Sequence, residues 1–327
     1  MFFYELILII ILVKICFKLT NGICKSNASL IGKTALVTGG NSGIGYHTAL
    51  GLAARGCRVI IASRSCSEDV KNQIIQHTNN PNVVIKNFDL GSLASIRRFA
   101  QELNEEEEKI DILINNSGSS GFGNKFTEDG LHLGMQINHF GPFLLTHLLI
   151  GLLKKSESAR VIFHSSYLSF FNNLSLENLN NPYCSKDQSL TSSKSDALTY
   201  SNSKACNIIV ANGFAERLSK FGIDVNSLHP GNVHTQIFSL AFNPHHSKSF
   251  IKAFYATLGF FFKTPFEGAQ TTLRLAISNK LKGTTGKHYW DCVQFPFLPG
   301  VVKDKQISSK IWTKSEELVK LTPEEKI

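Results

Sequence analysis

Apolar residues follow two alternating patterns along the chain from about residue 30 onward. Short continuous apolar runs alternate with segments in which apolar residues recur every three to four positions. The continuous runs predict buried strands, and the periodic segments predict amphipathic helices. Strands are predicted at 34–38, 59–62, 83–85, 110–114, 161–163 and 223–228, with a seventh at 287–292. Helical segments are predicted at 46–55, 94–103 and 143–153, among others.

This alternation indicates the fold class. Buried strands joined by helical crossovers form a parallel sheet that is covered on both faces. We therefore expect an α/β fold with a single Rossmann-type doubly wound parallel sheet of about seven strands and helices on both faces. Residues 33–327 contain no internal repeat or low-complexity segment and are predicted to form one domain.

The first residues have a different pattern. Residues 2–17 are apolar except for Glu5 and Lys14. A helix of this length would reach roughly 24 Å, against about 30 Å for the hydrocarbon core of a bilayer. A retained membrane anchor at 1–19, followed by a linker at 20–32, is favoured over a cleaved signal peptide, which would begin with positive charge. The pattern leaves open whether the anchor spans the bilayer or only inserts into it.

Lysines on the C-terminal side of this segment predict its orientation. Lys18, Lys25 and Lys33 follow the apolar run, and positive flanks stay on the cytosolic side. We expect an endoplasmic reticulum or lipid-droplet membrane protein whose main domain faces the cytosol.

Composition excludes several classes of protein. The 327 residues are 43% hydrophobic and 18% charged, which disfavours disorder. The net charge is +9, but the basic residues are scattered, so nucleic-acid binding is not expected. Seven cysteines without a C-x-x-C pair favour free thiols in a reducing compartment over disulfides or a metal site.

A glycine-rich turn follows the first predicted strand and precedes a helix. Gly39, Gly43 and Gly45 leave the backbone bare at the point where a helix begins. Free amides and the helix dipole at such a point bind a pyrophosphate, and bare glycines let it approach. A simple glycine-rich turn is the alternative. Under the binding interpretation, Asn41, Ser42 and Ile44 also line the dinucleotide site.

The end of the second predicted strand bears on the choice of dinucleotide. In NAD-binding proteins of this fold an acidic residue there binds the ribose hydroxyl, whereas an arginine accommodates the 2′-phosphate of NADP. Here the strand ends with Ser63 and Arg64, and the first acidic residue is Glu68. NADP(H) is therefore the predicted cofactor, the alternative being that Arg64 is a solvated loop residue.

Tyr200 and Lys204 are the candidate catalytic pair. A separation of four residues places both on one face of a helix. A tyrosine with a pKa near 10 is a weak acid or base at neutral pH unless a cation stabilises its phenolate. Lys204 is expected to lower the pKa of Tyr200 in this way. Taken alone, such a pair is also common on surface helices.

The ordered set of motifs resembles the short-chain dehydrogenase/reductase family over about residues 33–236. The segment Thr38-Gly39-x-x-x-Gly43-x-Gly45 is similar to the family's cofactor fingerprint, and Y-x-x-x-K at Tyr200 and Lys204 to its catalytic pair. The resemblance implies that Ser166 and Asn138 complete the catalytic set. It also implies that Tyr200 and Lys204 contact the cofactor, together with Asp89, Leu90, Asn116, Gly118, Pro230, Val233 and Thr235.

Two features narrow the resemblance to one branch. The stretch between Ser166 and Tyr200 is long, and "TPFEGAQTTLRLA" and "GKHYWDC" near the C-terminus are similar to the retinol dehydrogenase and WW-domain oxidoreductase branch. The Asn- and Ser-rich insert before Tyr200 is a departure from the retinol dehydrogenases. Ser117 is a departure from the family's N-N-A-G motif, which has alanine at that position.

A Phe-rich segment at about 237–266 follows the motif that the resemblance places on the nicotinamide. It carries eight phenylalanines, from Phe238 to Phe266, which suits a lid over an apolar substrate. The alternative interpretation, that these phenylalanines are core or membrane-contact residues, is left open.

The prediction is therefore an NADP(H)-dependent oxidoreductase that interconverts a hydrophobic alcohol and its carbonyl, such as a retinoid, a steroid or a lipid aldehyde. No metal is needed. Reduction is the favoured direction, because cytosolic NADP is kept reduced. In that direction Tyr200 would donate the proton and Ser166 would bind the carbonyl oxygen, while Asn138 would anchor a water. A catalytically silent NADP(H)-binding sensor or scaffold is the alternative. The sequence leaves open the substrate and the oligomeric state, a homodimer included.

Overall fold

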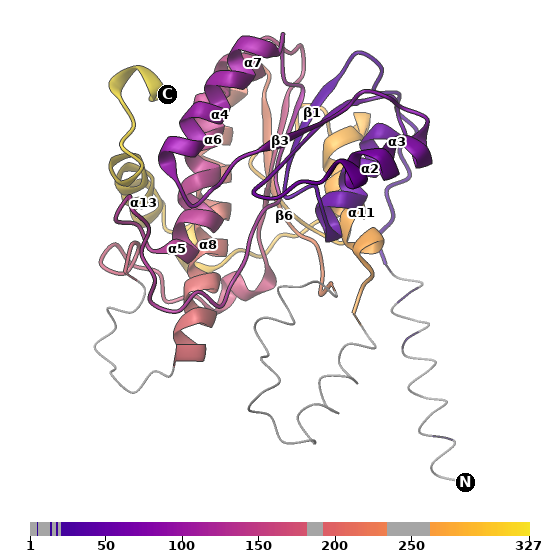
Figure 1. The fold of residues 1–327 in the computed structure, drawn as a ribbon. Coiled ribbons are helices and arrows are strands. Elements are labelled where there is room, and N and C mark those ends of the chain that lie inside the picture. Colours follow the sequence, from indigo (N-terminus) through magenta and orange to yellow (C-terminus); the bar gives the residue numbers. More distant parts are fainter. Residues whose placement is uncertain (1–4, 6–13, 15–17, 19–20, 182–191, 234–261) are drawn as a thin grey trace.

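The computed structural model of the chain describes residues 5, 14, 18, 21–181, 192–233 and 262–327. Within them the fold is built on one sheet of eight strands in the order β3-β2-β1-β4-β5-β6-β7-β8 (Figure 1). Strands β1 to β7 pair in parallel, and β8 is antiparallel to β7. The predicted parallel α/β fold is confirmed, with one strand more than expected.

The strands agree with the apolar runs to within two residues at most ends. They are β1 (Thr34–Thr38), β2 (Arg58–Ser63), β3 (Val83–Asn87), β4 (Ile112–Asn115), β5 (Arg160–His164), β6 (Asp224–His229), β7 (His288–Trp290) and β8 (Val293–Gln294). Strand β1 is buried along its whole length, because helices cover both faces of the sheet. The extra strand, β8, has two exposed residues and therefore no apolar run to reveal it.

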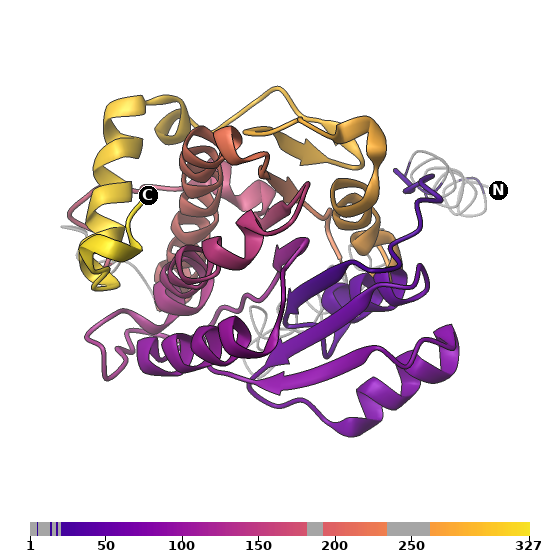
Figure 2. The same ribbon diagram turned by 90° about the horizontal axis from the view of Figure 1, so that it is seen from above.

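Helices form a layer on each side of the sheet, as Figures 1 and 2 show. One layer consists of α2 (Gly43–Ala53), α3 (Glu68–Thr78) and α11 (Pro265–Ile277). The other consists of α4 (Leu93–Glu106), α6 (Gly141–Leu148), α7 (Ile150–Lys154) and α8 (Ser192–Leu218). Helices α12 (Gly300–Lys303) and α13 (Lys305–Leu318) pack against α8 on its outer side. Each layer closes over its own apolar core cluster.

The predicted helix at 143–153 is two helices in the structure. Leu149, with φ −100° and ψ 2°, separates α6 from α7. Almost all of α6 is buried, and α7 buries Ile150, Leu152 and Leu153, so buried apolar residues continue across the break and conceal it. The remaining short elements are α5 (Leu133–Met135), η1 (Gln136–Phe140), η2 (Tyr167–Phe171), η3 (Ser219–Phe221), η5 (Asn279–Leu281) and η6 (Pro323–Glu325).

Residues 21–31, which we call the N-terminal strap, run along α11. The side chain of Asn21 and the backbone of Cys24 donate hydrogen bonds to Glu267 and Gln270, at 3.3 and 3.2 Å. Further along, Ser26 Oγ donates to the carbonyl of Ile277 at 3.3 Å. The strap is thus attached to successive turns of one helix.

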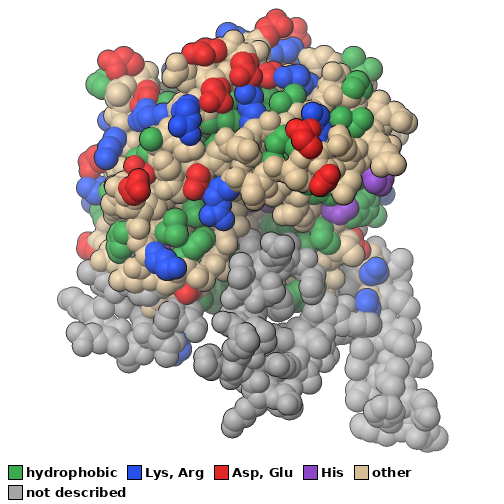
Figure 3. Space-filling model, viewed as in Figure 1, with side chains coloured by type: hydrophobic (Ala, Val, Ile, Leu, Met, Phe, Trp, Pro, Cys, Tyr) green, Lys and Arg blue, Asp and Glu red, His purple; other side chains and the backbone are tan. Residues whose placement is uncertain are grey.

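Two observations concern the membrane and the charge distribution. Among the described residues, no helix has the length and apolar character that crossing a membrane requires. Most of the predicted anchor at 1–19 lies outside the described residues. On the face shown in Figure 3, lysine and arginine side chains are interspersed with aspartate and glutamate.

Candidate active site

Most of the predicted site residues lie at one edge of the sheet. Because β1 to β7 are parallel, their carboxyl ends meet at this edge, which is where α/β folds bind ligands. The glycine-rich turn follows β1, Ser63 ends β2, Asn116 follows β4, Ser166 follows β5 and Pro230 follows β6.

The glycine-rich turn requires glycine for two physical reasons. Gly39 and Gly43 have φ of +66° and +54°, in the left-handed region. Gly45 is buried against the turn, and a Cβ there would lie 2.1 Å from the carbonyl oxygen of Gly39. Helix α2 can therefore approach the end of β1 only with glycine at these positions.

The N-terminus of α2 suits an anionic group. In the described part of the chain, the side chain of Ser42 does not cap the helix, and the first turn holds no acidic residue. The first-turn amides, from Gly43 onward, are thus left to an external acceptor, and the helix dipole adds a positive field. These residues fit the pyrophosphate of a dinucleotide.

A network of hydrogen bonds joins this turn to the end of β4. Asn116 Nδ2 donates to the carbonyl of Thr38 at 2.8 Å, and Thr38 Oγ1 accepts from the backbone amides of Asn116 and Ser117 at 3.1 Å each. Ser117, where the family has alanine, is accommodated, and its hydroxyl faces Gly39.

The residues predicted to bind the adenosine half lie at the ends of β2 and β3. Arg64 is exposed just beyond β2, and Asn41 Nδ2 donates to the carbonyl of nearby Ser65 at 3.1 Å. Asp89 Oδ1 accepts from the amide of Gly91 at 2.8 Å and so shapes the turn after β3, while Leu90 is buried. The structure leaves the Arg64 side chain accessible to a phosphate.

Tyr200 and Ser166 lie close together, and the Ser166 hydroxyl acts on the pKa of Tyr200 as a hydrogen-bonding neighbour. Ser166 lies just after β5, and its hydroxyl also accepts a hydrogen bond from the amide of Leu168 at 3.2 Å. Burial raises the pKa of Tyr200 to about 12, the bond to Ser166 opposes this rise, and Tyr167 adds to it. The lowering of the Tyr200 pKa that we expected from Lys204 is not found.

The position of Lys204 explains this correction. Its Nζ donates to the carbonyl of His164 at 3.1 Å and lies 5.4 Å from the centre of the Tyr200 ring. Burial lowers the pKa of Lys204 itself to about 8. The amine also lies close to Gly118, because a Cβ there would be 3.0 Å from Nζ.

Asn138, like Lys204, lies beside Gly118. It belongs to the π-helical turn η1, a distortion that is frequent at functional sites. Its Oδ1 accepts from the amide of Ser119, and its Nδ2 donates to the Ser119 carbonyl, both at 2.8 Å. The same Oδ1 would be 3.3 Å from a Cβ at Gly118. Asn138 therefore fixes the backbone that follows Gly118 and keeps its oxygen near Lys204.

The loop after β6 lies beside α2 and α11. Gly231 has φ +90°, in the left-handed region. Val233 packs closely against Gly268 of α11: a Cβ at Gly268 would lie 2.6 Å from Val233 and 3.1 Å from Ile44 of α2. The structure thereby brings Pro230 and Val233 to the side of the glycine-rich turn. Thr235 and most of the Phe-rich segment at 237–266 lie outside the described residues.

Two polar residues beside the site were not predicted from the sequence motifs. Asn207 Nδ2 donates to the carbonyl of His164 at 3.0 Å, so it shares this acceptor with Lys204. Its place three residues after Lys204 on the same helix face was the available signal. His229 is buried between the rings of Tyr167 and Trp290, and neither of its ring nitrogens has a hydrogen-bond partner among the described residues.

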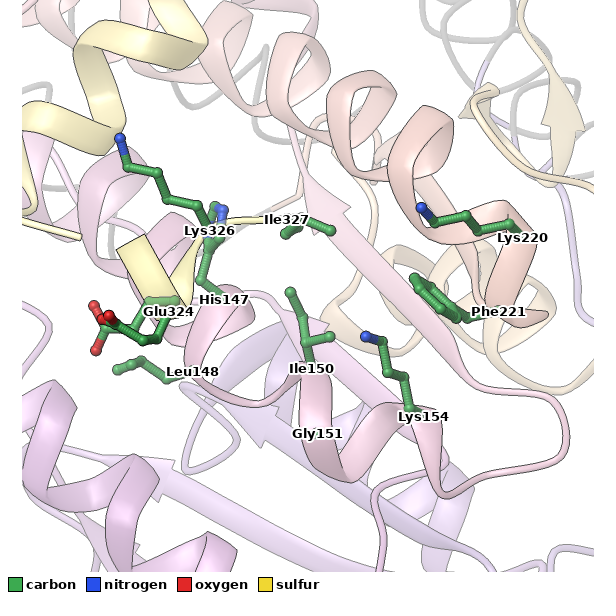
Figure 4. A pocket seen from close by; sticks show the side chains of 11 residues that line it. His147, Leu148, Ile150, Gly151, Lys154, Lys220, Phe221, Glu324, Lys326 and Ile327 are labelled. Atoms are coloured by element: carbon green, nitrogen blue, oxygen red, sulfur yellow. The ribbon is translucent and has the colours of Figure 1, made fainter. Parts of the chain in front are cut away.

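A separate pocket of about 470 Å³ lies elsewhere in the fold (Figure 4). Its lining includes Lys154, which precedes β5, and Phe221, which precedes β6, together with the C-terminal residues Lys326 and Ile327. It therefore lies toward the amino ends of the strands, opposite Tyr200, and is not the candidate active site.

Comparisons with known proteins identify the family of the chain. Residues 33–178 match the short chain dehydrogenase family model. Retinol dehydrogenase 14 of Mus musculus is 38% identical over 300 residues, covering 88% of this chain and 86% of that protein. Retinol dehydrogenase 11 of Homo sapiens is 34% identical over 305 residues, covering 93% and 91%.

Solved structures are similar as well. The Pseudomonas aeruginosa RhlG/NADP active-site complex has a TM-score of 0.60 and 28% identity, covering 80% of this chain and 95% of that chain. An uncharacterised protein from Mycobacterium paratuberculosis has a TM-score of 0.66 and 27% identity, covering 89% and 95%.

Proposed function

The chain belongs to the short-chain dehydrogenase/reductase family, in its retinol dehydrogenase-like branch, and on that premise we propose that it interconverts a hydrophobic alcohol and its carbonyl with NADP(H). The observation that carries the proposal is that Tyr200 and Ser166 lie beside each other at the carboxyl edge of the sheet, on the same side as the open N-terminus of α2.

NADP(H) is proposed over NAD(H) because of the residues at the end of β2. Arg64 is exposed there, and its guanidinium can pair with a 2′-phosphate through charge-assisted hydrogen bonds. An NAD-binding site would present an acidic side chain, which β2 lacks at this end. RhlG, a structural relative, is named as a complex with NADP.

The protonation of Tyr200 favours the reductive direction. With a pKa raised to about 12 by burial, the phenol holds its proton at neutral pH and is a hydrogen-bond donor. A group in that state can protonate a carbonyl oxygen as charge develops on it, whereas alcohol oxidation would need the phenolate. Bound NADPH would supply the hydride. Ser166, which lies beside Tyr200, can donate to the same oxygen.

Lys204 has a supporting role in this scheme. Its amine is held beside Gly118 by the His164 carbonyl, where it can donate to the cofactor ribose and supply a positive charge below its pKa of about 8. Asn138 keeps the Ser119 backbone fixed next to Gly118 and can offer its oxygen to a water that exchanges protons with Lys204.

A hydrophobic substrate is proposed from the named relatives and the aromatic surroundings of the site. Tyr167, His229 and Trp290 pack in a row of rings beyond Ser166. A membrane anchor at residues 1–19 would place the domain where such a substrate concentrates, and we propose that it holds the domain on the cytosolic face of the endoplasmic reticulum or a lipid droplet.

A turnover screen tests the proposal. Purified full-length protein with NADPH is presented with retinal, steroid ketones and long-chain aldehydes, and cofactor oxidation is followed by absorbance. NADPH-dependent reduction of at least one of these substrate classes supports the proposed oxidoreductase function. NADPH binding without any turnover across the panel would favour the alternative, a catalytically silent sensor or scaffold.

A further inference from the structure

The N-terminal strap and the loop after β6 are both attached to the carboxylate of Asp291. This residue lies in the turn between β7 and β8, and its Oδ1 accepts a hydrogen bond from the amide of Gly22 at 2.7 Å. The same oxygen pairs with Lys263 Nζ at 2.5 Å. We propose that Asp291 is a positioning residue, which holds residues 230–233, here called the cofactor loop, through Lys263 and couples that loop to the docked strap.

Lys263 contacts three consecutive residues of the cofactor loop. Its backbone amide donates to the carbonyl of Asn232 at 2.7 Å, and it forms a parallel β-bridge with Val233. Its side-chain methylenes pack on Gly231, where a Cβ would lie 2.8 Å from Cδ and 2.9 Å from Cε. The position of the Lys263 side chain therefore sets the position of the loop.

The Lys263 side chain needs a carboxylate in order to stay there. It is 12% exposed, and an ammonium so far removed from water is costly without a counter-charge. Asp291 supplies that counter-charge in its ion pair with Lys263. Without the Asp291 charge, the Lys263 ammonium is better solvated when it moves out toward water. The methylenes of the Lys263 side chain then no longer pack on Gly231.

The strap depends on the same turn. A Cβ at Gly22 would lie 2.1 Å from the backbone oxygen of Asp291, so a side chain there would push the strap away. Asp291 itself has φ +53°, which asparagine also adopts readily. Asp291→Asn therefore keeps the backbone and an acceptor for Gly22 and removes the charge that holds Lys263.

The inference rests on the proposed function, which places the cofactor loop against the nicotinamide half of NADPH. The test titrates NADPH and NADH into the full-length protein by fluorescence and measures the Tm of the cofactor-free protein. Asp291→Asn should raise the Kd of both cofactors by about three- to tenfold, the usual range for one lost polar interaction. The Tm should change by no more than about 2 °C, because the backbone of the turn is kept.

A double-mutant cycle separates positioning from general damage. Lys263→Met should weaken binding to a similar extent, and Lys263→Met with Asp291→Asn should bind no worse than Lys263→Met alone. Gly22→Ala should raise the Kd in the same direction. Ser26→Ala is the matched control, since it removes a strap contact to Ile277 without touching Asp291, and its Kd should equal that of the wild type.

Three results would overturn the inference: an unchanged Kd in Asp291→Asn, additive losses in the double variant, or equal effects of Gly22→Ala and Ser26→Ala. If the wild type binds NADPH while these variants behave identically to it, the inference fails and the proposed function stands. If the wild type binds neither NADPH nor NADH, both are wrong.

Discussion

Lys204 Nζ donates its hydrogen bond to the backbone carbonyl of His164, 3.1 Å away, and not to Tyr200, one helical turn before it. The carbonyl also accepts from Asn207, so the last residue of β5 fixes two polar side chains of α8. Lys204 is thereby held at the edge of the site, facing Gly118, where a cofactor ribose can reach it. Its proposed contribution is a contact to the cofactor rather than a direct effect on the Tyr200 phenol.

Replacing Arg64 tests the choice of cofactor. Arg64→Ala removes the partner of the 2′-phosphate, and NADPH binding should weaken by about 1.5–3 kcal/mol, or roughly ten- to a hundredfold in Kd. NADH lacks that phosphate, so its Kd should stay the same. Fluorescence titration of both cofactors checks the difference, and an equal loss for the two would contradict the assignment to NADP(H).

Gly118 lies against both Lys204 and Asn138, and a methyl group there tests whether that close spacing matters. Gly118→Ala would place a Cβ 3.0 Å from Lys204 Nζ and 3.3 Å from Asn138 Oδ1, so the amine must move. We expect kcat to fall by about tenfold, the equivalent of roughly 1.4 kcal/mol. Gly300→Ala is the control, because a Cβ there meets nothing within 4 Å. Equal kcat values for the two variants would show that the spacing is unimportant.

The pKa of Lys204 predicts a pH dependence. Burial favours the neutral amine and lowers its pKa from 10.5 to about 8, so the positive charge is present below about pH 8 and lost above it. We expect kcat/KM for NADPH to decline about tenfold per pH unit above that value, since this parameter reports the free enzyme. Tyr200, with its pKa near 12, stays protonated over this range and does not cause the decline.

The variant Lys204→Met provides the control for this profile. It has no titrating amine at this position, and its kcat/KM should be low at every pH without the decline near pH 8. A wild-type profile that stays flat to pH 10 would contradict the assignment of the charge to Lys204.

Two exposed glycosylation sequons test the proposed topology. Asn27 and Asn173 are exposed and each begins an N-x-S motif, whereas Asn115, in a third such motif, is buried in β4. With the domain in the cytosol, none of them meets the lumenal transferase, and glycosidase treatment should leave the mass of the membrane-bound protein unchanged. A mass shift would reverse the orientation. Deletion of residues 1–17 should release the domain from membranes.

The parallel core could be predicted from the sequence because its strands are buried on both faces. Strands such as β1 are then continuous apolar runs, which no amphipathic helix resembles. Edge strand β8 has two exposed residues and gives no such signal. The break at Leu149 was hidden for the opposite reason, because buried apolar residues continue from α6 into α7.

Sequence motifs identified the residues of the site but not their electrostatics. Tyr200, Ser166 and Lys204 are brought together as expected, yet the rise in the Tyr200 pKa comes from burial by residues that are distant in sequence. Spacing on a helix gives the face on which a side chain lies, not the acceptor that it selects. The partner of Lys204 is a β5 carbonyl, and the partner of Lys263 is a turn residue after β7.

The most direct test of the proposed function is the rate of carbonyl reduction by Tyr200→Phe compared with the wild type. The substitution keeps the ring and removes only the hydroxyl, which lies beside Ser166. Positioned proton transfer is typically worth about 10²–10⁴-fold in rate, so kcat should fall by that factor while the Kd for NADPH stays the same. If Tyr200→Phe reduces the best carbonyl substrate as fast as the wild type does, Tyr200 is not the proton donor and the proposed mechanism is wrong.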